Sequence, residues 1–193
     1  MRGIDNMRKE VRFAGFGGQG IIRAGLMLAM ASSIYAGKNA VQTQSYGPES
    51  RGGSCKSEVV ISDEEIDYPK VDDPDVLVVM SQEAFNTYAK TVKPDGTLIL
   101  DPDMVPRHEF NGNARVFLVP STKIAEELGK TIVANVVMLG ALVAITDLTS
   151  AEAFKNSLLS NIPKGTEKLN LTAFEKGYEY GRKLLEETAA IKH

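Results

Sequence analysis

Short apolar runs alternate with longer helical patterns through the first two thirds of the chain. Strands are predicted at residues 11–14, 40–44, 75–80, 97–100 and 114–119, and the mainly apolar runs 11–14, 75–80 and 97–100 indicate buried ones. The run 54–62 alternates instead, which predicts a strand with two different faces. One face would carry Cys55, Ser57, Val59 and Ile61, and the other would carry Lys56, Glu58 and Val60.

Helices are predicted between and after these strands, at residues 21–36, 82–92, 121–129, 131–146 and 149–159, with a last one after Thr172. Gly37 is typical of a left-handed end to the first helix, and Ser81 of an N-cap. Thr149 with Glu152, and Thr172 with Glu175, have the spacing of a capping box. An apolar stripe follows in the last helix, formed by Phe174, Tyr178, Gly181, Leu184 and Leu185.

This order of elements predicts an α/β fold of the doubly wound, Rossmann-like kind. Its sheet would be mostly parallel and flanked by helices, with a helical C-terminal part. The length suits one domain over residues 1–193, with residues 1–9 expected to be frayed.

Composition narrows the classes of function. The 193 residues carry a net charge of −3, which argues against general binding of nucleic acid. One cysteine and two histidines cannot form an internal disulfide, a four-ligand zinc site or an iron–sulfur cluster. The apolar run 132–145 contains Asn135 and is too short for a membrane span, and the polar N-terminus lacks a signal-peptide core. We therefore expect a cytoplasmic protein with no membrane or nucleic-acid partner.

A glycine loop, Gly15-Phe16-Gly17-Gly18-Gln19-Gly20, lies between the first strand and the first helix. Strand, glycine turn and helix together present backbone N–H groups and a positive helix end to a phosphate. We therefore predict ligand-binding roles for Gly15, Gly17, Gly18, Gln19 and Gly20; the alternative is that the glycines only let the helix pack close to the strand. An NAD site would also need an acid about 20 residues further on. Residues 42–45 contain none, which disfavours a free-standing dehydrogenase without removing it as the alternative function.

A second polar loop spans residues 45–53, after the second strand. In a doubly wound sheet it would lie at the same carboxyl edge as the glycine loop. Arg51 offers a guanidinium fork for phosphate or carboxylate, and small neighbours allow close approach of backbone. The predicted ligand-binding residues here are Ser45, Tyr46, Gly47, Arg51, Gly52 and Gly53. An exposed surface turn and a subunit contact are the alternatives.

Several other polar residues have ordinary structural explanations. Cys55 is expected to be a small buried residue, and His108 a solvated one. The acidic stretches 63–65 and 72–73 are expected on a solvated surface rather than around a metal. Asn135 should find a hydrogen-bond partner in the core or on another subunit.

The two loops together resemble the gamma subunit of 2-oxoacid:ferredoxin oxidoreductases. The pairing of Gly15–Gly20 with Gln42–Gly53 carries the likeness, and the stretches 57–62, 66–69 and 80–84 extend it. The resemblance covers at least residues 11–101 and is nearest to the 2-oxoglutarate branch; branched-chain 2-oxoacids, pyruvate and indolepyruvate stay open as substrates.

The resemblance implies a non-catalytic subunit, inactive alone, in a complex that converts a 2-oxoacid and coenzyme A to acyl-CoA, CO2 and reduced ferredoxin. Thiamine diphosphate with Mg and the iron–sulfur clusters would belong to alpha, beta and iron–sulfur partner subunits, and ferredoxin would be reached only through them. Coenzyme A, as co-substrate, is the ligand that the glycine loops would meet. A purely structural interaction subunit without a ligand is the further alternative.

Overall fold

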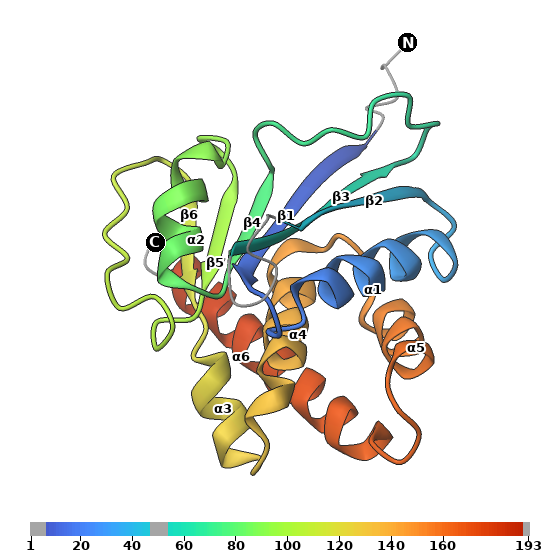
Figure 1. The fold of residues 1–193 in the computed structure, drawn as a ribbon, viewed down its shortest axis with the longest axis vertical. Helices are drawn as coiled ribbons and strands as arrows, with labels where there is room; N and C mark the ends of the chain where they lie inside the picture. Colours follow the sequence, from blue (N-terminus) through green and yellow to red (C-terminus); the bar gives the residue numbers. More distant parts are fainter. Residues whose placement is uncertain (1–6, 47–53, 191–193) are drawn as a thin grey trace.

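A six-stranded mixed sheet organises the chain, with strands in the order β2-β3-β1-β4-β5-β6 (Figure 1). The computed structural model describes residues 7–46 and 54–190. The strands are β1 (Arg8–Phe16), β2 (Asn39–Tyr46), β3 (Ser54–Ser62), β4 (Val76–Val79), β5 (Thr97–Leu100) and β6 (Arg115–Leu118). Strands β1, β4, β5 and β6 pair in parallel, whereas β3 pairs antiparallel with both β1 and β2. The predicted α/β class with a mostly parallel sheet is confirmed.

Two strands are longer than the sequence predicts. β1 begins at Arg8, so Arg8 and Lys9 are sheet residues although they lie within the stretch expected to be frayed. β2 continues through Ser45 and Tyr46, which the sequence pattern places in the following loop. Both extensions consist of polar residues that pair with β3, and pairing between backbones leaves no apolar signal in the sequence.

The helices lie on both faces of the sheet. They are α1 (Ile21–Ser33), α2 (Gln82–Tyr88) followed by the 3-10 turn η1 (Ala89–Thr91), α3 (Ser121–Glu127), the 3-10 turn η2 (Thr131–Val133), α4 (Ala134–Thr146), α5 (Ala151–Asn161) and α6 (Glu167–Ala190). Val76 and Val78 of β4 face the core formed with α1, α4, α5 and α6, while Leu77 and Val79 face the core formed with α2. Coverage of both faces explains the continuous apolar run of this strand.

Helix ends are where the sequence predictions failed most often. Ser150, not Thr149, caps α5, since its side chain accepts a hydrogen bond from the Ala153 N–H at 3.1 Å. Thr172 lies inside α6, which begins at Glu167, and its hydroxyl donates to the Lys168 carbonyl at 2.9 Å. A hydroxyl followed by an acid three residues later also occurs within helices, where the hydroxyl bonds back to the preceding turn.

The other end signals are confirmed. Ser81 accepts a hydrogen bond from the Ala84 N–H at 3.2 Å and begins α2. Gly37 has φ 69°, and its N–H donates to the Ser33 carbonyl at 3.1 Å, which ends α1. The first and second predicted helices stop earlier than expected, at Ser33 and Tyr88, with turn and 3-10 geometry beyond.

α4 is the buried helix that the apolar run predicted, and it packs against α6 with backbones close together. A Cβ atom at Gly140 would overlap the Phe174 carbonyl oxygen, and one at Gly177 would overlap that of Val137. Only glycine permits this approach. In the described part of the chain, no helix is both long and apolar enough to cross a membrane.

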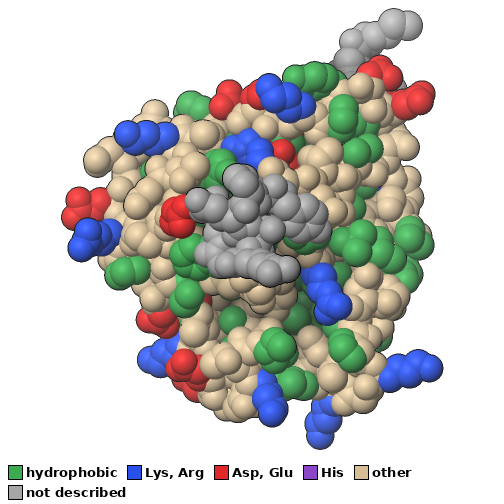
Figure 2. Space-filling model, viewed as in Figure 1, with side chains coloured by type: hydrophobic (Ala, Val, Ile, Leu, Met, Phe, Trp, Pro, Cys, Tyr) green, Lys and Arg blue, Asp and Glu red, His purple; other side chains and the backbone are tan. Residues whose placement is uncertain are grey.

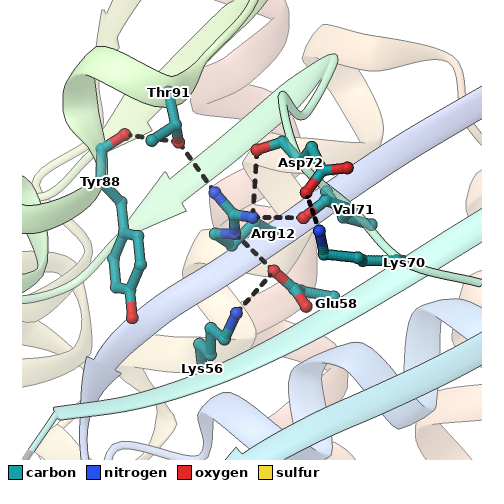
Figure 3. A network of polar contacts seen from close by, with 8 residues as sticks. All are labelled: Arg12, Lys56, Glu58, Lys70, Val71, Asp72, Tyr88 and Thr91. Carbon is teal, nitrogen blue, oxygen red and sulfur yellow. Dashed lines mark hydrogen bonds and ion pairs between the residues drawn. The ribbon is translucent and has the colours of Figure 1, made fainter.

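Acidic and basic side chains are interspersed over the face seen in Figure 2. A charged group is also buried beneath the surface, where Arg12 of β1 is only 4% exposed (Figure 3). Its Nε donates to Glu58 of β3 at 2.7 Å, and its guanidinium also reaches the Thr91 hydroxyl at 2.8 Å and the Val71 carbonyl at 2.6 Å. This one side chain therefore joins the sheet to η1 and to the connection before β4.

Candidate functional site

The glycine loop joins the carboxyl end of β1 to the start of α1. Gly18 and Gly20 have φ values of 97° and 78°, a left-handed conformation that favours glycine. Gly20 is the N-cap of α1 and supplies no side chain to cap it. Within the described residues, the N–H groups of Gly17, Gly18 and Gly20, and of the first helical turn, residues 21–23, donate to no protein acceptor. Such an array of free donors at a helix N-terminus suits an anion.

Gln19 has a structural role in this loop. Its Oε1 accepts a hydrogen bond from the Phe16 N–H at 2.7 Å, and its Nε2 donates to the Met80 carbonyl at 2.7 Å. Because Met80 follows β4, the side chain ties the ends of two neighbouring strands together. A Cβ atom at Gly15 would overlap Gln19 Oε1, so glycine is needed there to admit the amide. Gly15 and Gln19 thus shape the loop, whereas Gly17 and Gly18 present it to solvent.

Replacing Gln19 by Ala should lower the free energy of unfolding by about 2 kcal/mol, because two hydrogen bonds are lost and two backbone groups lose their partners. Urea unfolding of the purified chain measures the change. Gln44→Ala is the matched control, since Gln44 is an exposed glutamine of β2. Equal stability of the two variants would show that Gln19 does not hold the loop.

The strands on either side of the second predicted loop lie next to the glycine loop at their loop-side ends. Phe16 pairs with Ser54, and Tyr46 pairs with Cys55, so β1 and β2 both end where β3 begins. The strand ends that flank the second loop therefore lie at the same edge of the sheet as the glycine loop, although the antiparallel strand β3 lies between β1 and β2. Ser45 is exposed in β2. The other predicted residues of this loop, Gly47, Arg51, Gly52 and Gly53, lie outside the described residues.

A cavity of about 520 Å³ opens beside the glycine loop. Its walls come from the loop, the first turns of α1, η2, the start of α4, and the segment that joins α5 to α6. Most of the lining side chains are apolar, among them Ile21, Ile22, Met27, Val133, Val136, Ile162 and Leu169. Cys55 also lines the cavity, and burial raises the pKa of its thiol, which keeps it protonated and weakly nucleophilic at neutral pH. Cys55 is therefore the buried residue that the sequence predicted.

Several polar residues that line the cavity were missed by the sequence-based predictions, among them Asn135, Arg23 and Asn170. Asn135 lines the cavity and lies against Gly20, where a Cβ atom would overlap its Nδ2. It is half-buried, and in the described part of the chain its amide has no hydrogen-bond partner, so the expected core bond is absent there. The sequence did offer a signal for Asn135, because it is a polar residue within the apolar run 132–145. Arg23 lies three residues after Gly20, and nothing in the sequence pattern marked Asn170.

Asp101 is a buried carboxylate at the carboxyl end of β5, a common place for functional residues in such sheets. Its oxygens are already occupied. Oδ2 accepts from the Ser121 hydroxyl at 2.6 Å and from the Thr122 N–H and hydroxyl at 2.7 Å each, and Oδ1 accepts from the Asp103 N–H at 3.0 Å. Asp101 therefore fixes the start of α3 and belongs to the scaffold.

The remaining polar residues considered in the sequence, His108 and the acidic stretches, do not line the cavity. His108 is half-buried rather than solvated, with Nδ1 2.7 Å from the Val105 carbonyl oxygen. The acidic residues at 63–65 and 72–73 are exposed, as expected. Among the residues that the structure describes, no group of three or more His, Cys, Asp or Glu side chains is arranged to hold a metal ion.

Comparisons with known proteins agree closely with one another. A model of the family described as pyruvate ferredoxin/flavodoxin oxidoreductase matches residues 10–180. The 2-oxoglutarate synthase subunit KorC of Methanocaldococcus jannaschii is 52% identical over 180 residues, which are 92% of this chain and 96% of that protein. The gamma subunit of a keto/oxoacid ferredoxin oxidoreductase from Geobacter sulfurreducens superposes with a TM-score of 0.80 at 43% identity, covering 90% of this chain and 98% of that one.

A third similar structure has a longer chain, and only part of that chain matches this one. The 2-oxoglutarate:ferredoxin oxidoreductase from Magnetococcus marinus, solved with 2-oxoglutarate, coenzyme A and succinyl-CoA bound, superposes with a TM-score of 0.79 at 26% identity. The match covers 91% of this chain but 31% of that chain. The same fold therefore occurs both as a separate subunit and within a larger polypeptide.

Proposed function

Since the chain belongs to the pyruvate ferredoxin/flavodoxin oxidoreductase family, we propose that it is the gamma subunit of a 2-oxoglutarate:ferredoxin oxidoreductase. The nearly complete overlap with the KorC subunit and with the Geobacter gamma subunit supports this assignment. The reaction would convert 2-oxoglutarate and coenzyme A to succinyl-CoA and CO2, with the electrons passing to ferredoxin.

Thiamine diphosphate, Mg and the iron–sulfur clusters belong, in this proposal, to partner subunits of the alpha, beta and iron–sulfur types. The whole sequence holds a single cysteine, which cannot ligate a cluster by itself. Ferredoxin would accept electrons from those partners. This chain alone should therefore oxidise no 2-oxoacid.

The proposed contribution of this chain is to bind coenzyme A, and the observation that carries it is the set of free N–H groups at the glycine loop. These N–H groups lie beside the 520 Å³ cavity. Arg23, in the first turn of α1, also lines this cavity, and its side chain is exposed. Among the described residues its guanidinium has no hydrogen-bond or ion-pair partner. Amide donors and a free guanidinium match the phosphate groups of coenzyme A, and Arg51 would add a second cation.

A free-standing dehydrogenase fits the same residues less well. The end of β2, where an acid would hold the ribose of NAD, instead carries Gln42 to Ser45. Gln42 is moreover engaged in packing, because its Nε2 donates to the Ile22 carbonyl at 3.0 Å and the Ser57 hydroxyl at 2.9 Å.

In the assembled complex, Arg51→Ala should raise the KM for coenzyme A by about tenfold and leave kcat nearly unchanged, because a charge-assisted hydrogen bond to phosphate is lost. Steady-state assays at varied coenzyme A concentration measure both constants. Arg182→Ala, at an exposed position of α6, is the control that removes a cation elsewhere. If Arg51→Ala weakened only the association of subunits, the loop would be an interface and not a ligand site.

A further inference from the structure

The two edges of the sheet differ in how they are protected. An edge strand presents a row of unpaired backbone N–H and C=O groups, and proteins commonly shorten such a strand, place charge or proline on it, or insert a bulge. β6 is an edge of this protected kind, because it has only four residues and begins at the exposed Arg115. β2, at the other edge, has eight residues.

β2 has none of these protective features. Its residues, Asn39–Tyr46, include no charged side chain and no proline. They pair one to one with β3, from Asn39 with Ser62 to Tyr46 with Cys55, so no bulge interrupts the strand. Within the described residues, β3 is its only neighbour in the sheet. Because alternate residues of an antiparallel strand turn their backbone groups away from the neighbour, β2 is able to pair with a further strand.

Exposed apolar side chains lie on the helices next to this edge. α1 contacts β2 and also α5, so the three elements form successive layers (Figure 1). Four of the seven large hydrophobic side chains that are exposed in the described chain belong to this region: Leu26 of α1, Ile34 and Tyr35 directly after α1, and Leu159 of α5. Ile34 is the most exposed of the four, at 66%. Apolar side chains that gather on one side of a protein indicate a contact with another protein.

The size of this side fits a contact between two proteins. β2 is about 27 Å long, at about 3.4 Å for each of its eight residues. Three layers, β2, α1 and α5, at about 10 Å each give a depth of about 30 Å. The product is about 800 Å², which is the area that each partner buries in a typical stable interface. The strand alone is too narrow for such an interface, so the helices have to take part.

The charges of β2 favour a second copy of this chain as its partner. In a contact with twofold symmetry each surface meets itself, and the two β2 strands would run antiparallel. Since β2 is uncharged along its whole length, no like charges would meet across the axis. Gln42, in the middle of β2, donates to the Ile22 carbonyl at 3.0 Å, and Leu26 lies one helical turn after Ile22. Leu26 is therefore near the middle of the edge.

We propose that this chain forms a twofold dimer in which the β2 strands of two copies pair antiparallel and join the two six-stranded sheets into one. The axis would be perpendicular to the sheet, so α1 of one copy would pack beside α1 of the other on the same face. Leu26 would contact its counterpart there. This inference goes beyond the proposed function, because it concerns how two copies of this subunit meet and not what either copy binds.

Light scattering after size-exclusion chromatography of the purified full chain tests the dimer. We expect twice the mass of the chain at about 10 μM, because interfaces of this size have micromolar or lower dissociation constants. Leu26→Glu and Thr43→Lys should each raise the dissociation constant by at least about tenfold, since each brings like charges together near the axis. Val116→Glu is the matched control, because Val116 is as exposed as Leu26, at 39%, but lies on β6.

Hydrogen exchange of the backbone amides tests whether the strands themselves pair. The amides of β2 should exchange more slowly in the dimer than after dilution to the monomer, because pairing gives them acceptors. Leu26→Glu should abolish this difference. The amides of β6 should exchange at a rate that does not depend on protein concentration.

Three results would overturn the proposal: a monomer at about 10 μM, a dimer that neither Leu26→Glu nor Thr43→Lys weakens, or exchange of the β2 amides that is independent of concentration. Slow exchange of β2 only in the assembled oxidoreductase, with the isolated chain monomeric, would assign this edge to a partner subunit and would also overturn it. Circular dichroism establishes that each variant is folded before its mass is compared.

Discussion

Replacing Arg12 by Ala is expected to lower the free energy of unfolding by about 3–5 kcal/mol, since Glu58 would remain buried without its principal partner. The two side chains are 5% and 9% exposed, and Arg12 Nε lies 2.7 Å from Glu58 Oε1. Lys56 also contacts Glu58, at 3.1 Å, but is itself 28% exposed and can compensate only in part. The guanidinium also lies over the Tyr88 ring, 5.3 Å from its centroid, a contact that the substitution removes.

A double substitution distinguishes the contribution of the ion pair to stability from the cost of leaving one buried charge without a partner. Arg12→Met with Glu58→Leu removes both charges and should be more stable than Arg12→Ala alone, because no buried charge is left uncompensated. Lys70→Ala is the control at the surface, since the side chains of the Lys70–Asp72 pair are 63% and 60% exposed and solvent screens their interaction. Urea unfolding compares all three variants. A loss of under 1 kcal/mol for Arg12→Ala would contradict the role assigned to this network.

Asp101→Ala should be the second most damaging change, with a loss of about 3–4 kcal/mol, because the start of α3 loses its acceptor while the Ser121 and Thr122 groups stay in place. Ser121 is fully buried, so its hydroxyl would lose its partner away from solvent. Asp103→Ala, an exposed aspartate of the same turn, should change stability little. Circular dichroism during urea unfolding measures both variants. Equal stability of the two would mean that Asp101 does not hold α3.

The sequence predicted most of the sheet, because burial on both faces leaves continuous apolar runs. β3 and β5 have the predicted bounds, Ser54–Ser62 and Thr97–Leu100. The antiparallel placement of β3 between β1 and β2 was not predicted, since strand order depends on which backbones pair and not on the local pattern. The start of α6 was missed because its first turn, residues 167–170, contains only one apolar residue, Leu169, and so has no apolar periodicity to mark it.

The candidate site was predicted in its position and only partly in its chemistry. The glycine spacing located the loop at the end of β1, and the geometry of Gly18 and Gly20 agrees with the need for glycine there. The structural role of Gln19 could not be predicted, because its hydrogen-bond partner, the Met80 carbonyl, is distant in the sequence. The same holds for Asn170, which α6 brings to the cavity from the far end of the chain.

We expect this chain to function only as a subunit of a larger complex. The most direct test of this expectation isolates the tagged chain from an extract of its native host. The isolated material is then assayed for 2-oxoglutarate-dependent reduction of ferredoxin, with and without coenzyme A. We expect the chain to copurify with thiamine- and cluster-bearing partners, to show coenzyme A-dependent activity in that complex, and to lose all activity when separated from them. Recovery of the chain alone, with binding of NAD(H) and no activity toward 2-oxoglutarate in any fraction that contains it, would contradict the account.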